Sequence, residues 1–258
     1  MQRVVDMCGA GKEFGMQRTI GVIDLGDFSC QPESRYGHQP YPLRTLGGRR
    51  VFEWMVDRLN KCALIDAVVV VGCHVPAHLI AMPRGGVGGP ARHQTVLSDH
   101  PRALSRLSQA AEMLECQWCV YMPATRPFVD PERIDHLLNH RDDGDCDFIG
   151  YDGENPDDTV GEIFHIDAIR RLRRQSAALA VEGGQTGSIR SILDHAPGAF
   201  HLKLLPQPSS AQRPDWQRTI VDEWDWEIVR SHVVGSQVVD SLDVGSQVVD
   251  SQVGAAAG

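Results

Sequence analysis

A strand, helix and strand pattern between residues 19 and 72 limits the possible folds of this chain more than any other feature. After the β-branched segment 19–25, apolar residues recur three and four positions apart at Val51, Phe52, Met55, Val56 and Leu59. This spacing places them on one face of a helix, predicted over residues 49–61. The uninterrupted run Val68–Val71, ending in Gly72, is typical of a strand buried on both faces of a parallel sheet. The segment is therefore a βαβ unit. We expect its ligand site in the long loop 26–48, beyond the carboxyl end of the first strand.

The rest of the chain continues the alternation of helices and strands. Periodicity predicts helices over 101–114 and from Pro131 onward, with Asp130 as the cap of the second. Strands are predicted at 118–122, 146–150, 162–166, 200–205 and 217–221, and the alternating pattern of 162–166 predicts a half-exposed strand. A basic helix should follow residue 166, and Asp222 should open a final helix.

We expect a single domain over residues 19–233. Residues 1–18 form a leader that we expect to be disordered, and the Gly- and Pro-rich stretch 74–93 is predicted to be a flexible surface loop. The tail 234–258 contains one octapeptide twice, which is too few copies for a solenoid, so it is interpreted as a disordered extension.

The net charge excludes some classes of partner. A formal charge of -9 argues against nonspecific binding to nucleic acid or to an anionic membrane, because both require a basic surface. No apolar run is long enough to span a membrane, and we expect a cytoplasmic protein. The seven cysteines are scattered through predicted helices and strands, which favours reduced thiols over a disulfide framework.

Two groups of residues with the spacing of metal ligands are not interpreted as metal sites. The pair Cys116 and Cys119 has redox or zinc spacing, but no second pair accompanies it, so both are predicted to be core thiols. The histidine pairs 74/78 and 136/140 lack the glutamate of a metalloprotease motif and are interpreted as surface residues.

Five segments in the same order resemble the cytidylyltransferases of the spore-coat polysaccharide type, which are related to the CMP-KDO and acylneuraminate cytidylyltransferases. These segments are Leu46–Arg49 with the following helix and strand, Leu97–Asp99 with Leu104–Leu107, Pro127–Pro131 with Ile134–Asp135, Gly161–Ile169, and Arg218–Asp222. The resemblance covers roughly residues 19–231. It implies a Rossmann-like nucleotide-diphospho-sugar transferase fold, a mostly parallel sheet flanked by helices.

The resemblance also implies a reaction, in which an anionic sugar oxygen attacks the α-phosphate of a nucleoside triphosphate and pyrophosphate leaves. It implies CTP as the nucleotide, an acidic or phosphorylated sugar as the acceptor, Mg2+ as the cofactor and a possible homodimer. Arg35 and Arg49 are the implied catalytic residues, and Asp222 is the implied metal ligand. The implied nucleotide-binding residues are Leu25, Gly26, Ser34, Arg44, Asp99, Arg106, Thr125 and Arg126.

The chain departs from the family pattern at two places that matter for catalysis. The phosphate loop S-x-R-L-P-G-K is replaced by the segment from Ser34 to Pro42, in which Arg35 can stand for the arginine but no residue matches the lysine. Thr125 stands where the family has a metal-binding aspartate. Mg2+ needs only one or two protein carboxylates, so Asp222 could hold it with the triphosphate, although capping of the last helix is the alternative role of Asp222. A degenerate member that binds nucleotide or a partner protein without turnover is therefore the second hypothesis, beside catalysis.

Overall fold

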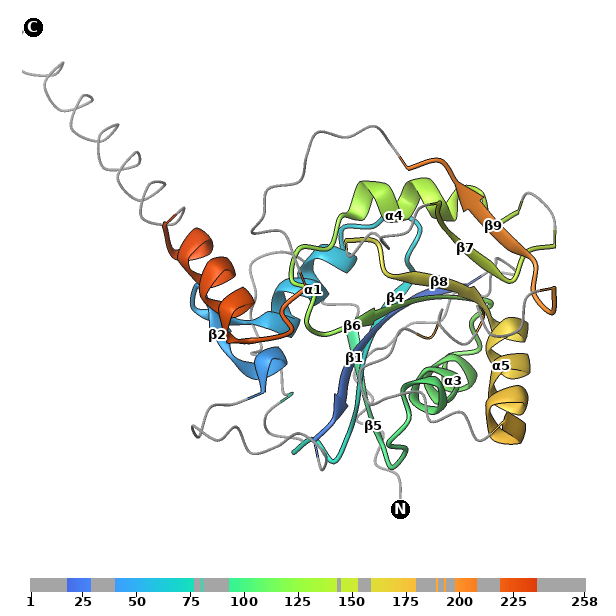
Figure 1. Cartoon of the computed structure of the whole chain (residues 1–258), viewed down its shortest axis with the longest axis horizontal. Helices are drawn as coiled ribbons and strands as arrows, with labels where there is room; N and C mark the ends of the chain where they lie inside the picture. The colour runs from blue at the N-terminus through green and yellow to red at the C-terminus, as the bar shows by residue number, and fades with distance from the viewer. Residues whose placement is uncertain are drawn as a thin grey trace, which may run out of the picture.

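The first strand, β1 (Thr19–Asp27), lies inside a seven-stranded sheet with the order β5-β4-β1-β6-β8-β7-β9. The structure is a computed structural model that describes residues 18–28, 40–76, 80, 93–142, 145–152, 159–179, 189, 193, 198–207 and 219–235. The other strands are β4 (Ala67–Cys73), β5 (His93–Ser98), β6 (Trp118–Pro123), β7 (Phe148–Tyr151), β8 (Glu162–His165) and β9 (Leu202–Leu205). All adjacent pairs are parallel except the two made by β8. The predicted α/β fold with a mostly parallel sheet is confirmed (Figure 1).

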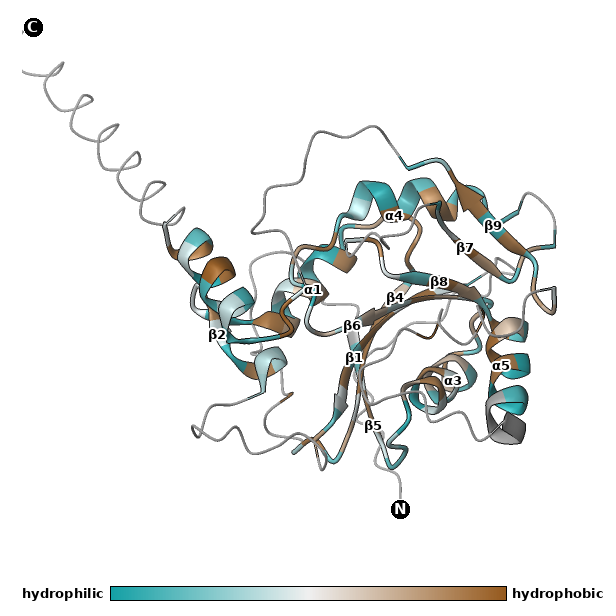
Figure 2. Cartoon of the chain, in the orientation of Figure 1, coloured by the Kyte–Doolittle hydropathy of each residue, from teal (hydrophilic) through white to brown (hydrophobic). Residues whose placement is uncertain are grey.

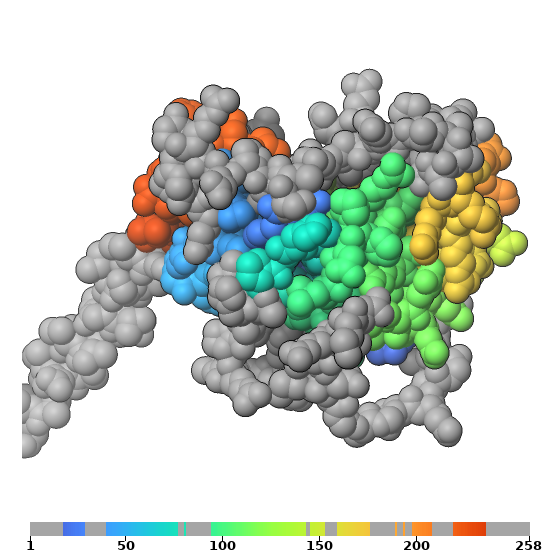
Figure 3. Space-filling view, turned by 90° about the horizontal axis from the view of Figure 1, so that it is seen from below, coloured from blue at the N-terminus to red at the C-terminus, as the bar shows by residue number. Residues whose placement is uncertain are grey.

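Helices cover both faces of the sheet because the central strands are apolar on both sides. In β1, Ile20 and Val22 face the core that contains α3 (Ala103–Met113) and α5 (Ile166–Leu179). Ile23 and Leu25 face the opposite core, which contains α1 (Val51–Leu59) and α4 (Pro131–Leu138). Figure 2 shows the strands as an apolar layer between helices with polar outer faces. Helices α3 and α5 pack side by side on their face of the sheet, as the view from below shows (Figure 3).

The predicted helices and the central strands are confirmed within a few residues of their expected ends. Asp130 caps α4 as expected, because its side chain accepts a hydrogen bond from the backbone N–H of Arg133 and Pro131 takes the first helical position. The last helix, residues 223–235, follows Asp222, whose Oδ1 accepts the backbone N–H of Asp225 at 2.9 Å.

Three details of the predicted fold were wrong. Strand β8 is not half-exposed, because Ile163 and Phe164 pack into the cores on opposite faces of the sheet, and Glu162 is only 5% exposed. Residues 219–221 form no strand, and the rest of that predicted strand lies outside the described residues. Strand β5 follows the predicted loop 74–93 and was not expected; residues 77–79 and 81–92 of that loop lie outside the described residues.

A short hairpin replaces the predicted first turn of α1. Strands β2 (Thr45–Leu46) and β3 (Arg49–Arg50) pair in antiparallel fashion, and Gly47 and Gly48 form their turn with φ angles of 56° and 79°. Both angles lie in the left-handed region that glycine adopts without strain. The hairpin, the preceding 3-10 turn η1 (Tyr41–Leu43) and the last helix enclose a small third core, formed by Leu46, Val51, Ile220, Trp226 and Val229.

Among the described residues, no helix is long and apolar enough to cross a membrane. The described cysteines, Cys62, Cys73, Cys116, Cys119 and Cys146, are all free thiols, as the sequence predicted. Cys116 and Cys119 are buried in the core, and their sulfur atoms lie 3.3 Å apart. Of the predicted leader and tail, only residues 18, 234 and 235 are among the described residues.

Candidate active site

The order of the strands reverses between β1 and β6, and their carboxyl ends therefore form a topological switch point. From β1 the chain moves outward to β4 and β5, and it then returns to β6 on the other side of β1. Asp24 lies opposite Pro123, and the backbone N–H of Ala124 donates to the carbonyl of Asp24 at 2.9 Å. Open α/β sheets bind ligands outside the strand ends at such a position. The expected place of the site is therefore present in this fold.

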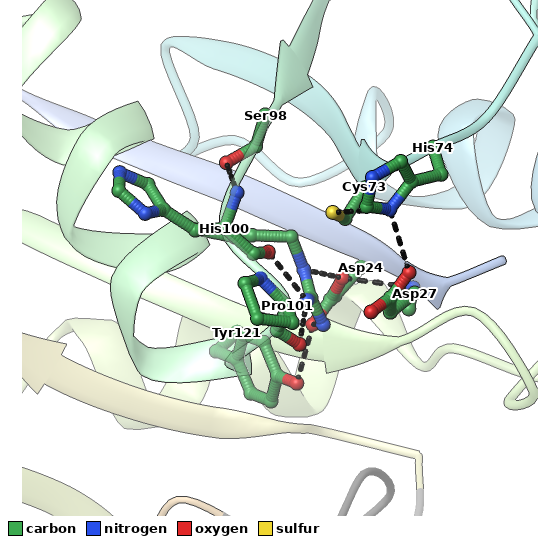
Figure 4. A network of polar contacts seen from close by, with 10 residues as sticks. Asp24, Asp27, Cys73, His74, Ser98, His100, Pro101 and Tyr121 are labelled. Carbon is green, nitrogen blue, oxygen red and sulfur yellow. Dashed lines mark hydrogen bonds and ion pairs between the residues drawn. The ribbon is translucent and has the colours of Figure 1, made fainter. Parts of the chain in front are cut away.

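A buried ion pair between Asp24 and Arg106 fixes this end of β1 (Figure 4). Arg106 donates from Nε to Oδ1 and from Nη2 to Oδ2 of Asp24, both at 2.8 Å. Tyr121 donates its hydroxyl to Oδ2 at 2.9 Å, and the backbone N–H of Gly26 donates to Oδ1 at 2.9 Å. The side chains of Arg106 and Asp24 are only 1% and 3% exposed. A bidentate pair of this kind combines charge with fixed geometry.

The same network sets the protonation of its members. Burial lowers the pKa of Arg106, but the hydrogen bonds and charge of Asp24 more than compensate, so the pKa of Arg106 is raised and its charge is retained. Burial, with the nearby charge of Asp24, holds the pKa of Tyr121 well above its usual value. Tyr121 therefore remains a neutral hydrogen-bond donor.

Arg106 was expected to border the nucleotide, and its described contacts are with the protein itself. Its Nη1 donates to the carbonyls of His100 and Pro101, at 3.0 and 2.5 Å, in the turn before α3. The guanidinium thus ties β1, β6 and this turn together. Asp99 is exposed in the same turn. Contact of either residue with a nucleotide stays a prediction.

Arg44 joins the segment before α1 to the last helix. Its Nη1 donates to both carboxylate oxygens of Glu223, at 2.9 and 2.8 Å, and its guanidinium lies 4.3 Å from the centre of the Tyr41 ring. The ring of Trp226 lies 5.4 Å away on the last helix. The side chain of Arg44 is 11% exposed, so a phosphate could reach it only by competing with Glu223.

Arg49 faces a different partner, on helix α1. Its Nη1 lies 2.5 Å from Oδ2 of Asp57, and the two side chains are 40% and 45% exposed. Hydrogen bonding to Asp57 outweighs the opposing effect of partial burial and raises the pKa of Arg49. Because the pair is solvent-exposed, it contributes little to the free energy of folding, and a phosphate could replace Asp57 as the partner of Arg49.

One backbone hydrogen bond links Thr125 to the segment just before Asp222. The N–H of Ile220 donates to the carbonyl of Thr125 at 2.8 Å, which places residues 219–222 beside the carboxyl end of β6. Asp222 is exposed and caps the last helix with one oxygen. Arg126, next to Thr125, is half-buried. Arg44 reaches the same segment through Glu223, so Arg44 and Thr125 both contact the segment 220–223, which contains Asp222.

The remaining expected residues divide between this edge and the part of the chain that is not described. Leu25 is buried in the core, and Gly26 has a φ of 87° and bonds to Asp24. Ser34 and Arg35 lie outside the described residues. The sequence interpretation missed Asp24, Tyr121 and Glu223. A carboxylate within the apolar run 19–25 was the available signal for Asp24, since a buried charge requires a partner.

The donors at this edge can be compared with what Mg2+ requires. Both oxygens of Asp24 already accept hydrogen bonds from Arg106, Tyr121 and Gly26, so Asp24 is not available as a ligand. Asp222 is exposed, and Thr125 adds only a neutral hydroxyl. One carboxylate with nucleotide oxygens and water is within the usual range for Mg2+. The residues therefore fit an ion that is held mainly by a triphosphate.

Comparison with known proteins places the chain in a family. The family model described as the MobA-like NTP transferase domain matches residues 33–197, which is more than half of the chain. The chain belongs to the MobA-like NTP transferase family. A search of curated proteins finds no match for this MobA-like chain.

Solved structures with the same fold include several nucleotidyltransferases. A cytidylyltransferase from Leptospira borgpetersenii serovar Hardjo-bovis has a TM-score of 0.60 at 11% identity, covering 89% of this chain and 94% of that protein. CMP:2-keto-3-deoxy-manno-octonic acid synthetase, solved with CTP, has a TM-score of 0.54 at 12% identity, covering 85% and 99%. The manganese complex of Rv0371C from Mycobacterium tuberculosis has a TM-score of 0.56 at 13% identity, covering 84% and 99%. At these identities the likeness establishes the fold of the MobA-like domain.

Proposed function

We propose that this MobA-like protein transfers a nucleotidyl group from a nucleoside triphosphate to an acidic or phosphorylated sugar, as a cytidylyltransferase of surface-polysaccharide biosynthesis. The observation that carries the proposal is that Arg44 and Thr125 both contact the segment 220–223, which contains Asp222 and lies beside the β1/β6 switch point. The family match and the resemblance to cytidylyltransferases support nucleotidyl transfer. The cytidine base and the acidic sugar rest on the resemblance and on the names of structural neighbours.

The reaction would be a single displacement at phosphorus. An anionic oxygen of the sugar forms a bond to the α-phosphorus, the bond from this phosphorus to the bridging oxygen breaks, and pyrophosphate leaves with that electron pair. Mg2+, when bound, would neutralise charge that develops on the phosphates. In this proposal Asp222 holds the ion, Arg44 and Arg49 contact phosphates after leaving their carboxylate partners, and Leu25 and Gly26 approach the nucleotide with their backbone.

A second function is favoured by a specific observation. Thr125 provides no charge where the resemblance expects a carboxylate, and Asp24 is fully engaged by Arg106. A protein with this site could bind nucleotide without turning it over. Loss of a charged group that acts on the transition state typically costs orders of magnitude in rate.

Binding and turnover are measured separately to decide between the two functions. Calorimetric titration with CTP, GTP, UTP and ATP, each with and without Mg2+, measures binding, and release of pyrophosphate over a panel of acidic and phosphorylated sugars measures turnover. Binding with pyrophosphate release supports the transferase, and binding without release over the whole panel supports the second function. Absence of binding to all four nucleotides contradicts both.

Asp222→Asn tests the proposed ligand without damaging the helix, because asparagine is an equally good cap. We expect the Mg2+-dependent part of nucleotide affinity to fall about tenfold or more, as for loss of a metal-supporting group, while Tm is unchanged. The matched control is Asp142→Asn, a 59% exposed carboxylate after α4. If both variants bind nucleotide as the wild type does, Asp222 does not hold the ion.

A further inference from the structure

A second group of potential ligands lies at the ends of two neighbouring strands, apart from Asp222. Asp27 is the last residue of β1, Cys73 is the last residue of β4, and the sheet register pairs these two residues directly. His74 follows Cys73 immediately. In Figure 4 the three side chains point toward one another beside the Asp24–Arg106 network. In the described part of the chain, these three residues form a group of potential metal ligands whose donor atoms lie close together.

The distances within this group are those of a nearly formed metal site. Nδ1 of His74 lies 3.0 Å from Sγ of Cys73 and 3.0 Å from Oδ1 of Asp27, and all three donor atoms lie within 4.8 Å of one another. In a tetrahedral zinc site, bonds of roughly 2.0 to 2.3 Å place donor atoms about 3.4 Å apart. Small side-chain movements would therefore bring all three atoms to coordination distance of one ion.

Hydrogen bonds hold the three side chains together, because the Cys73 thiol and His74 both bond to Asp27. Nδ1 of a neutral histidine carries either one hydrogen or one lone pair, so it cannot donate to Asp27 and accept from the Cys73 thiol at the same time. A cation between the three atoms would instead accept one lone pair from each. His74 also adopts a φ of 55°, the left-handed region, which turns its ring back toward the strand ends.

We propose that Asp27, Cys73 and His74 bind a divalent transition-metal ion of the zinc class. Thiolate and imidazole ligands favour zinc or cobalt over magnesium, which prefers oxygen ligands alone. On binding, the Cys73 thiol gives its proton to solvent and a metal–sulfur bond forms. With its proton on Nε2, a neutral His74 would offer the lone pair of Nδ1 to the ion. One thiolate and one carboxylate then balance the double positive charge, which suits a site where Asp27 and Cys73 are buried.

The proposed site would tie β1 to β4 at the edge where loops leave the sheet. The side chain of His74 is 59% exposed, so the ion can enter from solvent, and the fourth coordination position is left for water or for an incoming ligand. The histidine pair 74/78 was interpreted as a surface pair. His74 is exposed as expected and also contacts Cys73 and Asp27, and residue 78 lies outside the described residues. The site does not depend on the proposed nucleotidyl transfer.

Metal binding by the full chain tests the proposal directly. Protein stripped with a chelator is titrated with Zn2+ in competition with a chromophoric chelator, and separately with Co2+, without nucleotide in either case. We expect one tight equivalent of Zn2+, and with Co2+ an absorption band from charge transfer between thiolate and cobalt. Added Zn2+ should also raise Tm, because an ion that binds only the folded chain stabilises it.

Three variants remove the ligands one at a time. Cys73→Ser should abolish the charge-transfer band, and His74→Asn and Asp27→Asn should each lower Zn2+ affinity at least tenfold. His74→Asn is the most informative variant, because asparagine tolerates the left-handed backbone and the side chain is exposed, so folding should be preserved. Cys146→Ser and His201→Asn are matched controls, and neither should change the binding.

Three results would overturn the proposal. The first is failure of the wild-type chain to bind an equivalent of Zn2+ in competition with the chelator. The second is full retention of binding in both Cys73→Ser and His74→Asn. The third is loss of binding in Cys116→Ser, which would assign the metal to the Cys116–Cys119 pair. None of these results bears on nucleotide binding, which is measured with Mg2+ in a separate titration.

Discussion

The Asp24–Arg106 pair allows a quantitative test of how the end of β1 is held. Asp24→Asn keeps the size of the side chain, and the remaining amide oxygen can still accept from Gly26 or Arg106. The new amide nitrogen, however, would face Nη2 of Arg106 and the Tyr121 hydroxyl, both of which are donors at 2.8 and 2.9 Å in the wild type. The variant thus leaves a guanidinium that is 1% exposed without its counter-charge.

The expected cost follows from this geometry. Removing one member of a buried, hydrogen-bonded ion pair costs about 3–5 kcal/mol. For a chain of this size, about 1 kcal/mol shifts Tm by roughly 2–4 °C, so Tm should fall by roughly 6–20 °C. Urea unfolding followed by circular dichroism gives the change in free energy of unfolding, and thermal scans give Tm. The matched control is Glu112→Gln, which weakens the exposed pair of Glu112 with Arg173 and should cost less than about 1 kcal/mol.

A double-mutant cycle with Arg106→Met separates the pair from the rest of the network. Because each single variant leaves one charge buried alone, the double variant should cost less than the sum of the two, by about 0.5–3 kcal/mol. A loss below about 1 kcal/mol for Asp24→Asn, or strict additivity in the cycle, would refute the account of this site as a buried pair.

Two further predictions concern other buried positions of the domain. Burial, with the nearby charge of Asp135, raises the pKa of the Cys62 thiol to about 12. Native protein should therefore be alkylated at Cys62 about a thousandfold more slowly at pH 8 than the unfolded chain, as peptide mapping after iodoacetamide treatment would show. Equal rates in native and unfolded protein would contradict the burial. Gly161→Ala should lower the free energy of unfolding in urea by about 2 kcal/mol or more, because its φ is 69° and its new Cβ would lie 2.5 Å from the carbonyl oxygen of Tyr121. An alanine variant as stable as the wild type would show that this backbone can relax.

The fold could be predicted where local pattern and burial agree. The β-branched runs of β1 and β4 are buried on both faces, and the periodic residues of α1 face one core. Prediction failed where neighbours decide the outcome. Strand β8 alternates like a half-exposed strand but packs into a core on each face of the sheet, and β5 is a polar strand that gains its place by pairing with β4.

The sequence predicted a place for the site on the fold, but not the contacts found there. Topology predicts a site beyond β1, and the resemblance selected Asp222 together with Arg44 and Thr125, which contact the segment around Asp222. The ion-pair partners of these residues could not be predicted from the sequence, because the partners lie far away along the chain. Arg106 is 82 residues from Asp24, and Glu223 is 179 residues from Arg44. Such pairs arise from the packing of separate elements, and local sequence carries no record of them.

Three of the four described arginines of the expected site share a feature that bears on nucleotide binding. Arg44 pairs with Glu223, Arg49 with Asp57 and Arg106 with Asp24, so these three arginines offer little net positive charge to a triphosphate. Arg44 is the arginine nearest the proposed metal ligand, because its partner Glu223 is 54% exposed and lies next to Asp222. Binding should therefore depend strongly on Mg2+ and should weaken as salt increases.

Glu223→Gln tests this charge balance directly. The change keeps a hydrogen-bond acceptor for Arg44 but removes the negative charge that competes with phosphate. We expect nucleotide affinity to rise about two- to fivefold in calorimetry, the size expected for one exposed ion pair. Glu227→Gln is the control, because Glu227 lies on the same helix but pairs with Arg230. An unchanged or lower affinity in Glu223→Gln, with Glu227→Gln behaving as the wild type, would show that Arg44 stays with the last helix and that phosphates bind elsewhere on the sheet edge.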